Sequence, residues 1–202
     1  MPVTDFAVNN PGTIVPVDDS ELVRQFKNGN EKAFNYLVKR HQPRLRQVAT
    51  ILMKDEQDAM DMVQDVFVKA YFKLRTFRED SALYTWLYRI LYNRCISQLR
   101  RKKIVTFLSF GEDEKVYDIP CEDPIPDTEC ERSELMREIM AALEKLPLRQ
   151  RTAFSLKQLN GLKFIEISDI MGITEGAAKA SYFHAVKKLQ NLLRNLGDDY
   201  GL

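Results

Sequence analysis

The sequence predicts an all-α fold of two small helical domains joined by an acidic flexible linker, the second domain containing a helix-turn-helix. Apolar residues recur at three- and four-residue intervals, and no convincing strand pair or hairpin turn interrupts them. With 202 residues and 45% hydrophobic side chains, the chain can bury real cores in one medium domain or two small ones. The predicted parts are a disordered tail at 1–17, a first domain at 18–103, the linker at 104–128 and a second domain at 129–202.

Charge is segregated along the chain, although the net charge is only +1. Residues 84–103 hold six cations and no Asp or Glu, whereas residues 111–131 hold nine acids and a single lysine. Segregated charge creates local fields that attract or repel a polyanion. Three prolines also break the helical periodicity of the acidic stretch, which therefore predicts a linker.

Four helices are expected in the first domain. Asp-Asp-Ser at 18–20 supplies N-cap chemistry for the first, and Asn-Gly-Asn at 28–30 turns the chain into the second. The third spans about 55–74, and the fourth holds residues 84–103.

The second domain is expected to restart as a helix near Glu131 and to stop at Pro147, with another helix to about Leu159. Gly172 then lies past the end of a short helix, and Thr174 is placed to cap the next one. Two helices joined by so few residues predict a helix-turn-helix.

The helix that holds residues 84–103 has an apolar stripe from Leu87 to Leu99 and an opposite face that carries Trp86, the only tryptophan. An indole beside guanidinium groups offers base stacking, worth roughly 1–3 kcal/mol per base, while the cations follow a phosphate backbone. This face therefore predicts a site for single-stranded nucleic acid. The alternative is that Trp86 folds back onto the loop at Phe77 and caps the core. The face consists of Trp86, Arg89, Asn93, Ser97, Arg100 and Arg101, with Ile90 among them.

The helix expected at 55–74 turns acids and apolar side chains outward together. Such a mixture would repel nucleic acid but suits a basic, partly apolar protein surface, and a plainly solvated face is the alternative. Three of the acids stand at helical spacing, yet no His or further carboxylate is placed to complete a metal shell, so no metal site and no cofactor are predicted. The outward residues are Asp58, Asp61, Gln64, Asp65, Val68 and Phe72.

The last helix has the pattern of a recognition helix. Lysine can meet phosphates or guanine, and phenylalanine can touch a thymine methyl group in the major groove. Against this interpretation, helix-turn-helix patterns occur by chance, and the histidine is also consistent with a solvated surface residue. The residues expected to project outward are Lys179, Phe183, His184, Lys187 and Lys188.

Cysteine usage and the N-terminal residues predict a cytoplasmic protein. Cys95, Cys121 and Cys130 are an odd set at wide spacing, which indicates reduced thiols instead of a disulfide framework or a zinc knuckle. The first seventeen residues lack the positive start and apolar run of a signal peptide, and no window is apolar enough for a membrane span.

Three motifs together resemble the extracytoplasmic-function (group four) sigma factors of bacterial RNA polymerase. They are DAMDMVQDVFVKAY at 58–71, TFREDSALYTWLYRILYNRCISQLRR at 76–101, and the stretch that begins LEKLPLRQRTAF and ends YFHAVKKL at 143–189. The resemblance implies that the first domain is sigma region 2 and the second is region 4. It also implies a non-enzymatic protein that has no small-molecule substrate and does not insert into the membrane.

The resemblance implies core RNA polymerase as a partner, through the clamp coiled coil of its β′ subunit and through its β flap. The acidic linker would thread the basic RNA-exit path, and an inhibitory anti-sigma factor is commonly implied by the family. The residues carried over to β′ binding are Asp58, Asp61, Gln64, Asp65 and Phe67.

Promoter DNA is the second implied partner. Melting and capture of the minus-ten element falls on Phe77, Arg78, Tyr84, Trp86, Arg89, Asn93, Arg94, Ser97, Arg100 and Arg101. Reading of the minus-35 duplex falls on Thr174, Lys179, Ser181, Phe183, His184 and Lys187. This recognition helix is poorer in arginine than in many relatives, so a less electrostatic grip is expected. Leu83 also occupies a position that is often aromatic at the base pocket.

Two rival functions follow from the residues alone. A self-sufficient helix-turn-helix regulator would bind a palindromic duplex as a dimer, but would not need the aromatic and basic helix. A metal-dependent nucleic-acid enzyme would use Asp58, Asp61 and Asp65, but lacks evident further ligands.

Overall fold

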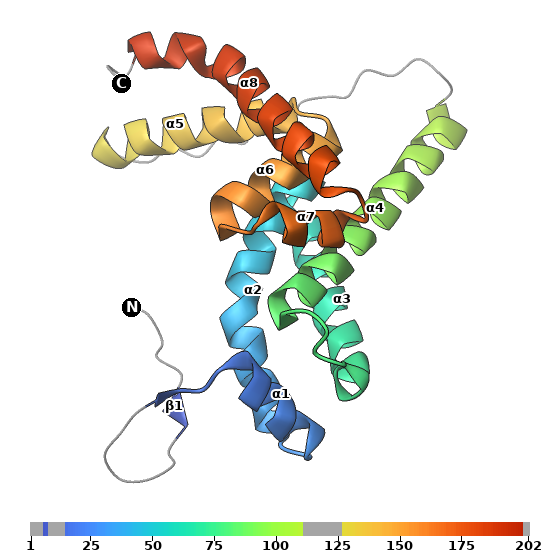
Figure 1. Ribbon diagram of the computed structural model, residues 1–202. Helices are drawn as coiled ribbons and strands as arrows, with labels where there is room; N and C mark the ends of the chain where they lie inside the picture. The colour runs from blue at the N-terminus through green and yellow to red at the C-terminus, as the bar shows by residue number, and fades with distance from the viewer. Residues whose placement is uncertain (1–5, 8–14, 111–126, 200–202) are drawn as a thin grey trace.

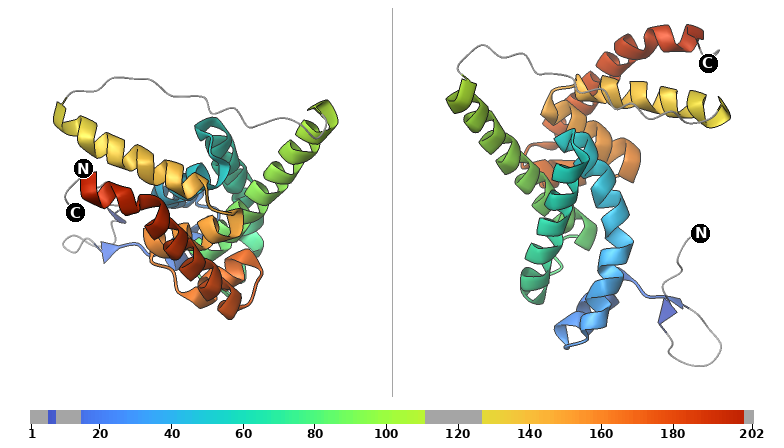
Figure 2. Two further views of the ribbon diagram at one scale, coloured as in Figure 1. Left: turned by 90° about the horizontal axis from the view of Figure 1, so that it is seen from above. Right: turned by 180° about the vertical axis from the view of Figure 1, so that it is seen from behind.

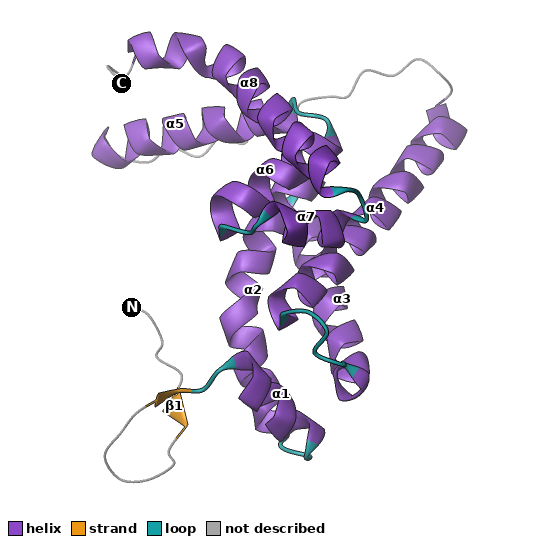
Figure 3. Ribbon diagram, viewed as in Figure 1, coloured by secondary structure: helices purple, strands orange, loops and turns teal. Residues whose placement is uncertain are grey.

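The computed structural model describes residues 6–7, 15–110 and 127–199, and the all-α prediction is confirmed for the two helical domains (Figures 1 and 3). The helices are α1 (Asp19–Lys27), α2 (Glu31–Met53), α3 (Glu56–Lys73), α4 (Leu83–Phe110), α5 (Asp127–Glu144), α6 (Leu148–Asn160), α7 (Phe164–Met171) and α8 (Glu175–Asp199), with a 3-10 turn, η1 (Leu74–Thr76), after α3.

The helix ends follow the local signals in the sequence. The Asp18 carboxylate accepts a hydrogen bond from the backbone N–H of Glu21 (2.7 Å) and so caps α1. Gly161 and Gly172, with φ of 66° and 64°, end α6 and α7 in the left-handed conformation that glycine adopts at little cost. The Thr174 hydroxyl accepts from the backbone N–H of Ala177 (3.2 Å) at the start of α8. The predicted helix-turn-helix is therefore present as α7 and α8.

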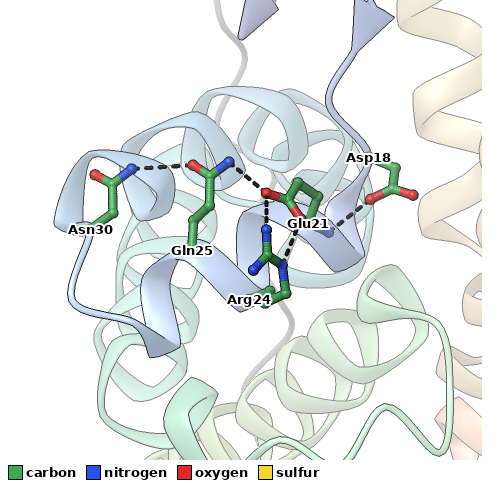
Figure 4. Close-up of polar contacts among 5 residues, drawn as sticks. All are labelled: Asp18, Glu21, Arg24, Gln25 and Asn30. Carbon is green, nitrogen blue, oxygen red and sulfur yellow. Dashed lines mark hydrogen bonds and ion pairs between the residues drawn. The ribbon is translucent and has the colours of Figure 1, made fainter. Parts of the chain in front are cut away.

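Helix α1 is held by a chain of polar contacts along its surface (Figure 4). Arg24 donates two hydrogen bonds to the Glu21 carboxylate, 2.7 Å from Nε and 2.8 Å from Nη2. Gln25 donates to the same carboxylate (2.9 Å) and accepts from Asn30 (3.1 Å) in the turn that leads to α2. The turn between α1 and α2 is thus tied to the body of α1.

The structure moves two predicted boundaries. Helix α4 continues to Phe110 and α5 begins at Asp127, so residues 104–110 and 127–128 are helical instead of linker. The run at 104–110 contains no Gly, Pro or acid, so nothing in it ends a helix. The rest of the predicted linker lies outside the described residues.

In the predicted tail, two short strands pair in the antiparallel sense, β1 (Phe6–Ala7) and β2 (Val15–Pro16), with Phe6 opposite Pro16. The prediction of disorder is wrong for these four residues, and Phe and Val are types that strands favour. Residues 1–5 and 8–14 of the tail lie outside the described residues.

Helices α2 and α3 form a hairpin whose apolar faces, together with α1 and α4, enclose the core of the first domain (Figure 1). Three rings pack edge to face or tilted at its α1 end, because Phe26 lies 5.4 Å from Phe34 and 5.4 Å from Tyr71. Cys95 is fully buried in this core, and burial raises the pKa of its thiol to about 12. This thiol is therefore protonated near neutral pH.

The two domains pack directly against each other, an arrangement that the sequence did not indicate (Figures 1 and 2). Helix α6 contacts α2, and α7 contacts α4. The interface between the two domains, where α6 meets α2 and α7 meets α4, is called the seam below. The buried core is continuous across it, and Ile51 of α2 belongs to the apolar cluster of the second domain, among Leu143, Leu146 and Leu189. The seam therefore buries apolar side chains of both domains.

Arg151 of α6 joins the seam to the end of α2. Its guanidinium is buried and donates to the backbone carbonyl of Leu52 (2.9 Å), and at 3.4 Å to that of Glu144. The carbonyl of Leu52 lies in the last turn of α2, where it has no partner within the helix and carries the negative end of the helix dipole. Burial lowers the pKa of Arg151, while the charge of Glu144 opposes that shift.

Replacing Arg151 with Met should lower the free energy of unfolding by about 1–3 kcal/mol, because the buried carbonyl of Leu52 loses a charged donor while the aliphatic stem is kept. Urea denaturation followed by circular dichroism measures this change. Arg149→Met, on an exposed position of the same helix, is the control and should change stability much less. Equal loss in the two variants would contradict the role of the Leu52 contact.

Candidate nucleic-acid interface

A small cavity lies where the loop after η1 meets the start of α4. Its volume is about 240 Å³, and its lining combines three cations, one acid and two aromatic rings with small polar side chains. Cations and rings at one opening suit a base attached to its phosphate. The lining residues are Lys73, Thr76, Phe77, Arg78, Asp80, Ser81, Trp86 and Arg89.

The position of Trp86 agrees in part with each of the two interpretations that the sequence allowed. Its ring is partly buried and packs against the core, with its centroid 5.1 Å from that of Phe77 at an angle of 41°. The indole therefore does fold back onto the loop, as the alternative held. It also lines the cavity together with Arg78 and Arg89, so part of it remains available to a ligand.

The remaining minus-ten candidates follow α4 away from the cavity. Asn93, Arg100 and Arg101 are exposed, and Ser97 is exposed but donates its hydroxyl to the backbone carbonyl of Asn93 (2.8 Å). Arg94 forms an ion pair with Asp65 of α3. Arg94 thus has a carboxylate beside it, although this carboxylate comes from another helix.

A second such pair links Lys102 to Asp58 of α3. The sequence segment 84–103 contains no acid of its own, so neither pair could be found by inspecting that segment. Both pairs are partly exposed, and exposed pairs contribute little to stability. Their main effect is to turn two of the predicted partner-binding acids toward α4.

The first turns of α4 also face the helix-turn-helix. Tyr84 donates a hydrogen bond to the carboxylate of Glu166 in α7, and Arg89 donates to the backbone carbonyl of Asp169 (3.1 Å). Tyr88 donates to the side-chain oxygen of Asn160 (2.5 Å). Two of the predicted minus-ten residues, Tyr84 and Arg89, are therefore engaged with the second domain.

The surroundings of Tyr84 and Tyr88 raise the pKa of both phenol groups. The hydrogen bond to Glu166 raises the pKa of Tyr84, and burial raises it further. Burial alone accounts for the raised pKa of Tyr88, against the opposing charge of Arg44. Both side chains are neutral donors near neutral pH.

The seam also explains Ile90, which the sequence placed on the outward face of α4. Ile90 and Leu83 are buried in the same cluster as Ile167, Ile170 and Met171 of α7. Helix α4 therefore has two apolar neighbours, and only the part of its surface between them faces outward.

An apolar groove runs between α2 and α3. It encloses about 720 Å³ and leaves Met60, Val68 and Phe72 exposed, the last by 75%. Large exposed apolar patches of this kind mark protein-binding surfaces. The sequence identified Val68 and Phe72 but missed Met60 and the α2 side of the groove, for which only the pairing of the two helices gives the signal.

The five predicted polymerase-binding residues divide between this groove and the other side of α3. Asp61, Gln64 and Phe67 line the groove, with Phe67 almost fully buried at its floor. Asp58 and Asp65 are paired with α4 and do not line it.

Most predicted residues of the recognition helix do project outward from α8. Lys179, His184 and Lys187 are exposed, and Phe183 is exposed by 62%. Ser181 is placed differently, because it is buried and donates its hydroxyl to the backbone carbonyl of Ala177 (2.7 Å). The prediction that Ser181 contacts DNA is therefore corrected.

An aromatic and cationic cluster that the sequence did not indicate supports this face of α8. Phe164 of α7 lies 5.6 Å from Tyr182 and 6.4 Å from Phe183. The ammonium groups of Lys157 and Lys179 stand 5.1 Å and 5.9 Å from the centre of its ring. Phe164 thus holds part of the recognition surface in place.

Within the described residues, no group of three or more His, Cys, Asp or Glu side chains is placed to hold a metal ion. No helix in the described part of the chain combines the length and the apolar character that crossing a membrane requires.

Comparison with known families assigns both halves of the chain. Residues 37–104 match the profile described as Sigma-70 region 2, and residues 136–189 match the profile described as Sigma-70, region 4. The first match covers the cavity, the groove except Phe34, and α4 as far as Ile104. The second covers α7 and α8 as far as Leu189.

Curated relatives match over nearly their whole length. The ECF RNA polymerase sigma-E factor of Haemophilus influenzae is 34% identical over 185 residues, which cover 88% of this chain and 96% of the relative. The RNA polymerase sigma-H factor of Pseudomonas aeruginosa is 32% identical, with coverage of 87% and 96%. The sigma-E factor of Escherichia coli K12 is 33% identical, with coverage of 88% and 95%.

Two solved structures are similar in sequence and in fold. One is CnrH in complex with the cytosolic domain of CnrY, with a TM-score of 0.65 and 29% identity over 88% of this chain and 97% of the other. The second is the sigma factor RpoE in complex with the anti-sigma factor NepR from Bartonella quintana, with a TM-score of 0.65 and 30% identity over 81% and 98%.

Proposed function

The chain belongs to the extracytoplasmic-function sigma factors of the sigma-70 family, which are non-enzymatic transcription initiation factors, and on this premise we propose that it reads two promoter elements with two separate surfaces. The observation that carries the proposal is that one chain holds both the aromatic and cationic cavity at Trp86 and an exposed recognition helix. The first suits an unpaired strand and the second suits a duplex.

The minus-ten element is opened and held at the cavity. Melting costs unstacking energy, which is offset when an extruded base enters the cavity beside Phe77 and Trp86. Arg78 and Arg89 line the same cavity, where their charges would attract the phosphates once the contacts with α7 are released. Asn93, Arg100 and Arg101 extend a polar and cationic path along α4. Strand opening of this kind needs no ATP.

The minus-35 element is read as duplex by α8. Lys179, His184 and Lys187 supply donors for phosphates or base edges, and Phe183 supplies an apolar contact. Thr174 contributes by capping the helix, which orients its first turn. With few cations on this surface, shape and apolar contact carry more of the recognition than charge does.

The groove between α2 and α3 is the docking surface for core polymerase. Its apolar rim and the acid Asp61 fit a basic, partly apolar helix pair such as the β′ clamp coiled coil. The β flap engages the second domain, and the acidic linker follows the RNA-exit path. An anti-sigma partner is also proposed, because two similar proteins have been solved in complexes with CnrY and with the anti-sigma factor NepR.

Promoter reading requires the seam to open at α4. Tyr84 and Arg89 cannot face a DNA strand while they are bonded to Glu166 and Asp169 of α7. Core polymerase holds the cavity at Trp86 and the recognition helix apart, and the free energy of binding to polymerase supplies the energy for this separation.

Addition of the purified chain to core polymerase on genomic templates should produce transcripts from discrete start sites, mapped by sequencing their 5′ ends. A dimeric regulator would instead protect a palindrome without polymerase, and a metal-dependent enzyme would nick DNA in a manner lost in Asp61→Ala. Absence of specific initiation by correctly folded protein would refute the proposal.

Replacing Trp86 with Ala should slow open-complex formation by roughly 5- to 150-fold, which corresponds to the loss of one base stack. Permanganate reactivity of promoter thymines measures the opening, and Trp86→Phe should retain part of it. Affinity for core polymerase should not change, because Trp86 lies outside the groove. Equal loss of opening and of polymerase binding would mean that Trp86 is structural.

Replacing Val68 with Asp should weaken binding to core polymerase by about tenfold or more, because a half-exposed apolar contact of the groove becomes a charge. Fluorescence anisotropy of labelled protein measures the affinity. Gln47→Asp adds the same charge at an exposed position of α2 that does not line the groove, and should bind normally. Loss of affinity in both variants would point to general repulsion instead of a docking surface.

A further inference from the structure

A lysine from α1 holds the loop that forms one wall of the cavity. The Nζ of Lys27 donates to the backbone carbonyl of Phe77 (2.8 Å) and lies 3.1 Å from a carboxylate oxygen of Glu79. The loop follows α1 by about fifty residues, so this contact is set by the fold and not by the local sequence. It fastens the loop at both its first and third residues.

Glu79 needs such support because of its backbone. Its φ is +60°, in the left-handed region that residues with a Cβ atom seldom adopt. Neither a glycine nor an asparagine stands there to make the conformation easy. A backbone of this kind persists where the surroundings determine it, and here Lys27 binds the side chain of the same residue.

The position of Lys27 is itself well fixed. Phe26, the preceding residue, is almost fully buried, and the network of Figure 4 ties Gln25 to Glu21 and to Asn30. The Lys27 side chain is only 30% exposed. Its ammonium group therefore contacts the loop from a helix end that is itself fixed in position.

Resting on the proposed function, we propose that Lys27 is a positioning residue for capture of the unpaired base. It fixes the position of the loop relative to α4, so that Phe77 stacks beside Trp86 and Arg78 lines the cavity. It also pairs with Glu79, whose negative charge would otherwise stand close to the phosphates of the strand. Lys27 acts through the loop and does not line the cavity.

The proposed role predicts an effect that is local to the loop, whereas a merely structural role predicts a loss of global stability. A partly exposed ion pair contributes little to global stability, so loss of Lys27 should leave the unfolding transition nearly unchanged. The change should be confined to the loop and should be visible at Trp86, which is the only tryptophan in the chain and packs on Phe77.

The first experiment measures quenching of Trp86 fluorescence by acrylamide, a neutral quencher, in the full chain. Lys27→Met should raise the quenching constant by roughly twofold as the loop opens locally. Lys27→Arg keeps a donor for both contacts and should restore it, and Lys32→Met, which removes an exposed ammonium group from α2, should have no effect. Unchanged quenching in Lys27→Met would overturn the assignment of the loop contact.

A second variant guards against a Lys27→Met protein that fails to fold. Asn tolerates the left-handed region, so Glu79→Asn removes the ion pair without adding backbone strain, while the bond from Lys27 to the Phe77 carbonyl remains. Its quenching constant should exceed that of wild type, because one of the two contacts of Lys27 with the loop is lost. A value no higher than that of wild type would overturn the proposal that the ion pair holds the loop.

The second experiment measures open-complex formation by polymerase that carries each variant, on a promoter found by transcript mapping. Lys27→Met should open it roughly 5- to 10-fold more slowly with unchanged affinity for core polymerase, and Lys27→Arg should recover most of the rate. A normal opening rate together with raised quenching would overturn the role in base capture. If the wild type does not initiate at all, the proposed function fails, whereas the quenching result still supports or overturns the contact between Lys27 and the loop.

Discussion

The packing of α4 between α3 and α7 is the constraint on which the rest of the structure depends. On one side its cations meet Asp58 and Asp65, and on the other its tyrosines meet Glu166 and Asn160. The start of the same helix forms a wall of the cavity at Trp86. One wall of the cavity, the orientation of the acids on α3 and the placement of the helix-turn-helix therefore all depend on one helix.

The seam combines two kinds of interaction that respond differently to separation. Buried apolar side chains such as Leu83, Ile90 and Ile51 supply most of the free energy, in proportion to the area that they remove from water. The hydrogen bonds from Tyr88 and Arg151 fix the register, and most of their energy is recovered from water when the surfaces part. Contacts between domains of one chain resemble transient protein interfaces, so a seam of this composition is suited to exchange for another partner of similar polarity.

Local features of the fold could be predicted from the sequence, whereas features that depend on two segments could not. Caps, turns and helical periodicity are properties of neighbouring residues, and they identified the helices and the helix-turn-helix, although α4 ends later and α5 begins earlier than predicted. The ion pairs of Arg94 and Lys102 span 29 and 44 residues, and a helical wheel shows no such partner. Ile90 was predicted to be exposed because the helical wheel was divided into one buried face and one outward face, whereas α4 packs against both α3 and α7. Ser181 could have been placed from sequence, because it stands three residues after Ala178 and four before Ala185 on the buried face of α8.

Two residues with a Cβ atom have a positive φ in the described chain, and the contrast between them shows why the loop before α4 is special. Lys54, with φ of 64°, follows the last residue of α2, where a left-handed residue is a common way to end a helix. Glu79 ends no helix, so its conformation has no such local cause. The cause lies in tertiary contacts, because the loop must cross from η1 to the first turn of α4 while keeping Phe77 against Trp86. A conformation that is held by contacts from α1 and placed beside a cationic cavity is typical of a binding site whose shape is fixed before its ligand arrives.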